Sequence, residues 1–248
     1  MHTLDYYKET FNSVGWFIPP YITLGFLSFL AKEIHDSNGA FDQNKLQEAL
    51  SHIYSECNLA AMVVSRYPIT PHVSDFAQTI EEAVESHFMG LDHVAVGGLL
   101  PVIEGVALKL AEDRSVKTNT RGSSFKNLAE HCKREVKDKN IGAVGEVISM
   151  IDSFIVYSES QLYVDSSKYS LSDNTNRHGI LHGAYSDMDY GEPINFYKAI
   201  SAIDFLCFIS AIRASISWLA PSPTDASERL AIYYHACSHF KNLRPARS

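Results

Sequence analysis

Apolar residues recur at the three-to-four-residue spacing of helices along most of the chain, and this period limits the fold more than any other feature. The segment Tyr21–Ile34 shows the period after two consecutive prolines, and Pro193 opens a longer apolar helix that the pattern carries to about Leu219. No strong run alternates apolar and polar residues, and no Asn-Gly or Asp-Gly pair joins two apolar stretches as in a hairpin. We therefore expect an all-α protein.

Capping and breaking residues predict where several helices begin and end. Asn38 and Gly39 end the first helix, and Asp42 has the position of an N-cap for a second helix whose apolar face extends to Cys57. Pro68 and Pro71 stop that second helix. Further helices are expected over Val73–Phe88, Leu91–Glu112, Phe125–Val136, Ile141–Ser160 and Ser227–Phe240. The polar stretch 116–124 is expected to be a loop, and 157–176 a long loop or a marginal strand.

Composition excludes some classes of protein. The chain has 248 residues, of which 46% are hydrophobic and 20% charged, so it is long enough and apolar enough to bury a sizeable core. A net charge of −8 argues against coating nucleic acid by bulk positive potential, although it leaves room for a small, locally basic cleft.

Cysteine usage and the N-terminal sequence bear on location. The four cysteines form no CxxC pair and are too sparse for a disulfide framework, which favours a reducing compartment. The first ten residues contain acids and no apolar run, unlike a signal peptide. The stretch 16–31, taken as the most apolar, contains two prolines and a glycine and is too short to span a membrane. We expect a cytoplasmic protein with no membrane partner.

The segment 176–183, with the sequence NRHGILHG, concentrates the chemistry-bearing side chains of the chain. It places the amide of Asn176, the guanidinium of Arg177 and the imidazoles of His178 and His182 directly after the polar loop. A guanidinium matches phosphate oxygens as a fork, and an imidazole exchanges protons near neutral pH. A helix beginning here would also leave free backbone N–H groups that attract phosphate. The segment therefore favours phosphodiester chemistry that needs no metal or other cofactor.

This pattern resembles the HEPN superfamily, the all-α bundles marked by an arginine, then four to six residues of which the first is polar, and then a histidine. Arg177, His178 and His182 occupy these positions, with Asn176 and Gly183 framing them. The upstream helix LLPVIEGVALKL, which contains Glu104, is similar to the LLPxIEG helix of a subset of these proteins. The resemblance divides the chain into an N-terminal helical region over 1–90, a HEPN-like bundle over 91–220, and a C-terminal helix in 221–248 packed on the bundle.

The resemblance implies an endoribonuclease that acts as a homodimer, with the two motifs meeting at the interface. His182 would activate the ribose 2′-OH, Arg177 would stabilise charge on the phosphorane, and products would carry 2′,3′-cyclic phosphate and 5′-OH ends. Asn176 and His178 would position the phosphate or base, and Glu104 would orient Arg177 or His182. RNA is the implied partner, and a toxin or defence effector with an antitoxin or activator is the implied biological class.

Spacing limits how this site can form on a single helix. Five residues at ~100° each place Arg177 and His182 about 140° apart, so the two side chains do not share a helical face. Either the arginine must wrap around the helix or a second chain must complete the site.

Other interpretations of the same residues remain open. Arg177 and His182 fit a capped helix start tied to nearby carboxylates such as Asp187 or Asp189, and a HEPN-like domain can also be a catalytically inactive binding module. Bare Arg–x5–His spacing recurs at 66–72 and 229–235, without a polar residue after the arginine. The i,i+4 pairs 178/182 and 235/239 allow a metal site, but neither forms an HExxH motif, and no metal is expected.

Overall fold

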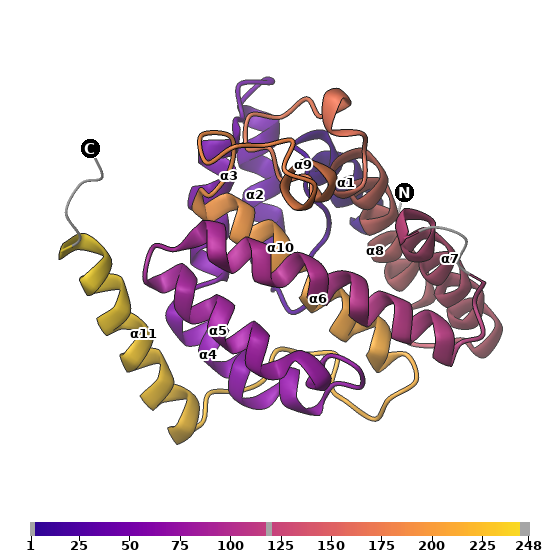
Figure 1. Ribbon diagram of the computed structural model, residues 1–248. Helices are drawn as coiled ribbons and strands as arrows, with labels where there is room; N and C mark the ends of the chain where they lie inside the picture. Colours follow the sequence, from indigo (N-terminus) through magenta and orange to yellow (C-terminus); the bar gives the residue numbers. More distant parts are fainter. Residues whose placement is uncertain (1–2, 118–120, 244–248) are drawn as a thin grey trace.

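The computed structural model describes residues 3–117 and 121–243 and contains eleven α-helices in these ranges, with no β-strand among them (Figure 1). The prediction of an all-α protein is confirmed. The helices are α1 Thr3–Ser13, α2 Leu24–Asp36, α3 Gln43–Ile53, α4 Glu56–Ser65, α5 Ala77–Phe88, α6 Asp92–Asp113, α7 Arg121–Lys139, α8 Val144–Tyr157, α9 Arg177–Leu181, α10 Pro193–Ala211 and α11 Asp225–Leu243.

Side-chain caps explain where the N-terminal helices differ from expectation. Helix α2 begins three residues after the expected Tyr21, because Thr23 is its N-cap and accepts a hydrogen bond from the backbone N–H of Phe26. Asp42 caps α3 as predicted. The helix expected to run on to Cys57 is instead two helices, since Ser55 caps a new helix, α4, two residues after α3 ends.

Three later boundaries also differ. Helix α10 ends at Ala211, eight residues before the expected Leu219, and an irregular segment with two prolines leads to α11. Helix α7 begins at Arg121, inside the stretch expected to be a loop, of which residues 118–120 lie outside the described part. The polar segment after α8 contains one π-helical turn at Ser158–Leu162 and one 3-10 turn at Ser166–Lys168 rather than a strand.

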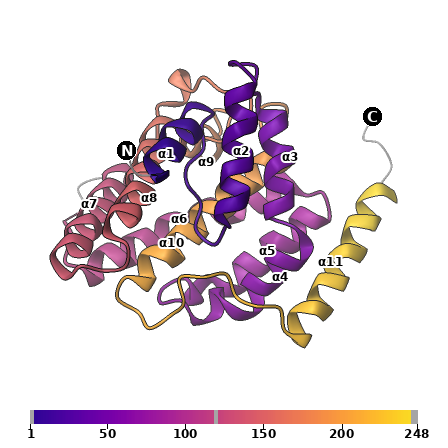
Figure 2. The ribbon, with the colours of Figure 1, turned by 180° about the vertical axis from the view of Figure 1, so that it is seen from behind.

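Helix α10 is the centre of the molecule. Every residue from Ile194 to Ala211 is buried, because α6 crosses one side of it and α3 packs against another (Figure 1). Helices α4 and α5 pack with α11 at one edge, and α1, α7 and α8 form the other end, as the reverse view shows (Figure 2). The buried apolar side chains form one continuous cluster that reaches from Leu4 to Cys237.

Two helices, α6 and α10, are long and apolar enough to cross a membrane by length and composition alone. The apolar window of α10 is wholly buried in the protein, and 61% of the α6 window is buried. Both are core helices of this fold. The stretch 16–31 is divided between a loop and α2 and does not form one continuous helix.

A charged group lies inside this core. The ammonium of Lys198, on α10, has no solvent exposure and contacts Asp173 Oδ2 at 2.9 Å and Gln43 Oε1 at 2.7 Å. Burial alone raises the pKa of Asp173, but Lys198 and hydrogen bonds from Thr175 and Tyr169 outweigh it and hold that pKa below its usual range. Asp173 therefore remains a carboxylate that ties the segment before α9 to the core helix.

We expect Lys198→Met to lower the free energy of unfolding by about 3–5 kcal/mol, because it leaves the Asp173 carboxylate buried without its cation. Urea unfolding followed by circular dichroism measures the change. Asp173→Asn in the same chain should restore part of the loss, since the remaining group is neutral.

Lys109→Met is the matched control, because it removes a lysine from an exposed pair with Asp75. It should change stability little. Equal effects of the two lysine substitutions would contradict a structural role for the buried pair.

Candidate functional site

The expected site forms around a five-residue helix, α9, whose length is fixed at both ends. Asn176 is its N-cap, with Oδ1 accepting from the backbone N–H of Gly179 at 2.8 Å. His182 is the C-cap residue. Gly183 follows with φ +67°, a left-handed conformation that glycine adopts without strain and that ends a helix. The cap at Asn176 and the left-handed conformation of Gly183 therefore explain why α9 begins and ends where it does.

The guanidinium of Arg177 lies at the centre of the site and contacts three other side chains. Its Nε and one Oε of Glu104 form an ion pair, and its Nη2 donates to the other oxygen, Oε2, at 3.2 Å. Its Nη1 donates to Nε2 of His182 at 2.7 Å and lies 3.3 Å from Nδ1 of His178. One buried arginine thus joins a carboxylate from α6 to two imidazoles from α9.

These contacts resolve the spacing problem posed by the sequence. Arg177 and His182 meet within a single chain because α9 stops after five residues and the arginine side chain wraps back toward the C-cap. The carboxylate partner of Arg177 is Glu104, whereas Asp189 accepts from Ser186 and the carbonyl of Asp187 contacts His93. The alternative interpretation, in which Asp187 or Asp189 pairs with the arginine, therefore does not hold.

The hydrogen bonds also define the state of the two imidazoles. A guanidinium only donates, so Nε2 of His182 and Nδ1 of His178 are acceptors in this arrangement. The rings lie nearly parallel, with centroids 5.7 Å apart and an interplanar angle of 13°. Each ring offers a lone pair to the same cation, so both imidazoles are unprotonated at the nitrogen that faces Arg177.

His178 has a lowered pKa with a clear physical cause. Partial burial disfavours its charged form, and the neighbouring charge of Arg177 acts in the same direction. The ring of Tyr163 lies against it at 6.2 Å in an edge-on arrangement. His178 is therefore held neutral beside the guanidinium.

Asn176 has a different role from the one expected. Its side chain is fully buried, and its Nδ2 donates to the backbone carbonyls of Gln161 and Val164, both at 2.9 Å. With Oδ1 used in the helix cap, the amide of Asn176 positions the backbone. Because α9 is short and its first residues are buried, its N-terminus is also not the open phosphate site that the sequence suggested.

Solvent exposure within the site increases from Arg177 to His182. Arg177 is only 5% exposed, His178 is half-buried and His182 is exposed. The chain then folds back, with the ring of Tyr185 packed against Gly179, where a Cβ atom would lie 2.1 Å from the ring. The edge of the site that a large molecule can reach is therefore formed by the imidazole of His182.

The other motif matches do not form comparable clusters. Arg66 donates to the carbonyls of Ser217 and Leu219, whereas His72 contacts Asp113. His235 and His239 contact each other at 3.1 Å on the exposed face of α11. Among the described residues, no group of three or more histidine, cysteine, aspartate or glutamate side chains is placed to hold a metal ion.

The sequence predicted the side chains that contact one another in the site, but not those that hold the preceding segment in place. Asp173 and Lys198 anchor the chain before α9, and Asn195 donates to the carbonyl of Asp173 and to Thr175. The available signal was Lys198 itself, one of two charged residues in the otherwise largely apolar helix α10. A charge in such a place requires a partner.

No protein-family model, no curated protein and no solved structure matches this chain.

We expect Glu104→Gln to destabilise the protein, because it removes the negative charge that compensates the buried guanidinium of Arg177. The loss should be about 3–5 kcal/mol in the free energy of unfolding, measured in urea. Glu112→Gln makes the same change at an exposed position of α6 and should have little effect. A similar stability for the two variants would contradict the role of Glu104.

We expect the imidazole of His178 to titrate below the ordinary histidine value of about 6.5, as measured by NMR on histidine-labelled protein. Because its pKa is lowered in the folded state, protonation favours the unfolded chain, and His178 contributes to loss of stability as pH falls below that value. The same residue in urea-unfolded protein is the control and should titrate normally. A folded-state midpoint at or above the unfolded one would refute the argument.

Proposed function

We propose that this protein is a metal-independent endoribonuclease of HEPN type. The observation that carries the proposal is the meeting of Arg177 with His182, His178 and Glu104 at one exposed edge of the fold. Glu104 and His182 are 78 positions apart in the sequence, yet both contact the guanidinium of Arg177, as His178 does. The resemblance of NRHGILHG to the HEPN motif supplies the reaction.

The contacts suggest how phosphate binding and base catalysis are linked. In the unliganded site, Nη1 of Arg177 occupies the lone pair on Nε2 of His182. A substrate phosphate would replace His182 as the acceptor for Nη1, since a charged oxygen is the stronger acceptor. Binding would therefore free the Nε2 lone pair at the moment when a base is needed.

Cleavage would then follow a single displacement at phosphorus. Nε2 of His182 takes the proton of the ribose 2′-OH, the 2′-oxygen bonds to phosphorus, and the bond from phosphorus to the 5′-oxygen breaks. The leaving 5′-oxygen gains a proton from solvent. Arg177 stabilises the charge on the phosphorane, and the products are a 2′,3′-cyclic phosphate and a 5′-OH.

A homodimer is part of the proposal. Glu104 neutralises the charge of Arg177 in one chain, so a single copy offers RNA little positive potential. The exposed position of His182 leaves room for a second copy to bring its own motif to the same RNA. In line with the resemblance, we place the enzyme in the cytoplasm as a toxin or defence effector with an antitoxin or activating partner.

A catalytically inactive HEPN-like binding module is the second candidate. The observation in its favour is the closed set of contacts around Arg177, in which a carboxylate and two imidazoles already use its donors. Such a cluster would stabilise α9 against α6 without any substrate.

We expect the wild-type protein to cleave mixed cellular RNA in EDTA and to leave 2′,3′-cyclic phosphate ends. His182→Ala should lower the rate by at least ~10²-fold, because it removes the base. His182 is exposed, so this variant should fold normally. Arg177→Ala should also abolish cleavage, and its fold must be verified because it leaves Glu104 unpaired.

His235→Ala and Arg229→Ala are matched controls, since they remove the same residue types, six positions apart rather than five, from the exposed face of α11. Both should cleave as wild type does. Cleavage that stops in EDTA would rule out the metal-independent mechanism. Absence of cleavage by folded wild-type protein across a range of concentrations would favour the binding module.

A further inference from the structure

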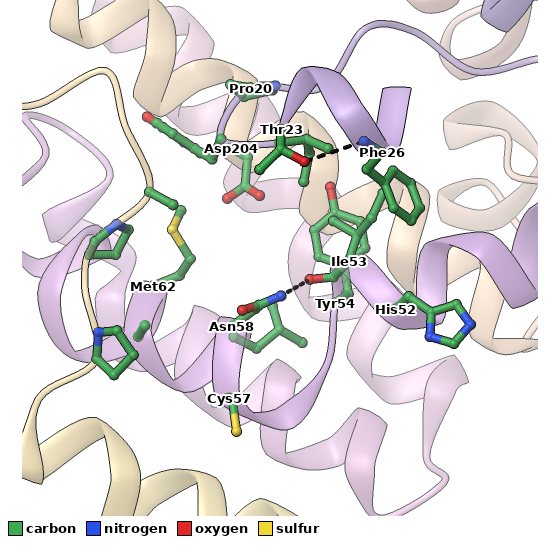
Figure 3. A pocket seen from close by; sticks show the side chains of 17 residues that line it. Pro20, Thr23, Phe26, His52, Ile53, Tyr54, Cys57, Asn58, Met62 and Asp204 are labelled. Atoms are coloured by element: carbon green, nitrogen blue, oxygen red, sulfur yellow. Dashed lines mark hydrogen bonds between the residues drawn. The ribbon is translucent and has the colours of Figure 1, made fainter. Parts of the chain in front are cut away.

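A cavity of about 340 Å³ lies away from the candidate site and contains none of its five residues. Five segments line it: residues 20–23, the start of α2, the junction of α3 and α4, one residue of α10, and residues 220–223. Its walls are mostly aromatic and aliphatic, with Phe26, Tyr54 and Met62 among them (Figure 3). Its volume falls in the lower part of the range of small-molecule sites.

A single buried carboxyl group faces this apolar space. Asp204, on α10, is 5% exposed, and its Oδ1 accepts from the hydroxyl of Tyr67 at 2.9 Å. Among the described residues, no group donates to Oδ2, and Asp204 has no ion-pair partner. Figure 3 shows the carboxyl group turned into the cavity. Burial raises the pKa of this group to about 7, with Tyr67 and Arg66 offsetting part of the effect.

A second polar group lies on the opposite wall. Asn58 donates from Nδ2 to the carbonyl of Ile53 at 2.9 Å, which leaves its Oδ1 as the atom available to a ligand. In Figure 3, Asn58 lies across the cavity from Asp204. Asp204 and Asn58 therefore each present a hydrogen-bond acceptor, at Oδ2 and Oδ1.

The wall between them is held in an unusual conformation. Tyr21 has φ +67°, a left-handed conformation that costs a residue with a side chain of order 1–3 kcal/mol. The guanidinium of Arg66 lies 5.0 Å from the centre of the Tyr21 ring and is fixed in turn by the carbonyls of Ser217 and Leu219. Strain retained in this way is a feature of preformed ligand sites.

We propose that this cavity binds a small amine, a compact apolar molecule that ends in an ammonium group. The ammonium donates to Oδ2 of Asp204, and the apolar part fills the space among Tyr21, Phe26 and Tyr54. Aromatic walls favour a cation, and the net charge of −8 raises the local concentration of cations further. An anionic ligand would be repelled by the Asp204 carboxylate, and the residues that line the cavity include no arginine or lysine to offset that repulsion.

The test uses the full-length protein and three probes of the same size: 2-phenylethylamine, 2-phenylethanol and phenylacetate. Isothermal titration calorimetry at pH 8 should show 2-phenylethylamine binding at least tenfold tighter than 2-phenylethanol and no binding of phenylacetate. Asp204→Asn keeps the acceptor for Tyr67 and removes the charge, so it should erase the preference for the amine. Asp36→Asn, on the exposed end of α2, is the matched control and should retain it.

Met62→Trp is a second variant that fills the cavity without touching Asp204, and it should block all three probes. It keeps the test decisive if Asp204→Asn does not fold. Any one of four results would overturn the proposal: equal affinity for the amine and the alcohol, binding of phenylacetate, unchanged amine binding in folded Asp204→Asn, or no binding of any probe at about 10 mM.

Discussion

The contact between Lys198 and Asp173 links the core of this protein to its candidate site. Lys198 belongs to the wholly buried helix α10, and its ammonium reaches both Asp173 and Gln43 of α3. Asp173 in turn accepts from Thr175 and Tyr169, which fixes the chain immediately before Asn176. A rigid core helix therefore sets where the first residue of α9 can lie, although the segment leading to it has little regular structure.

The position of Arg177 follows from this arrangement. Asn176 caps α9, Gly183 ends it, and Glu104 of α6 holds the guanidinium in the gap between the two helices. Buried ion pairs add little net stability, because desolvation offsets the attraction between the charges. Their value here is geometric: the orientation of Arg177 is fixed by a carboxylate on a different helix from the imidazoles that it contacts.

The helical period and the capping residues predicted the fold class and most helices, because apolar spacing directly reflects burial of one helix face. The division at Ser55 was missed since the apolar period continues through it, and only its side-chain bond to Asn58 shows the break. The three side chains that contact Arg177 were predicted to act together with it, but the way in which the arginine reaches His182 depends on where α9 ends. The anchoring by Lys198 and the cavity at Asp204 involve residues that are distant in sequence, and no local pattern encodes them.

The central place of α10 has a consequence for how the chain folds during synthesis. Helices α3 and α6 bury their faces against a segment that begins only at residue 193, so about three quarters of the sequence must leave the ribosome before its core can close. Until then, the apolar surfaces of the earlier helices are without their main partner, and such surfaces favour aggregation or binding to chaperones. Helix α10 is thus translated after α3 and α6, the helices that pack against it.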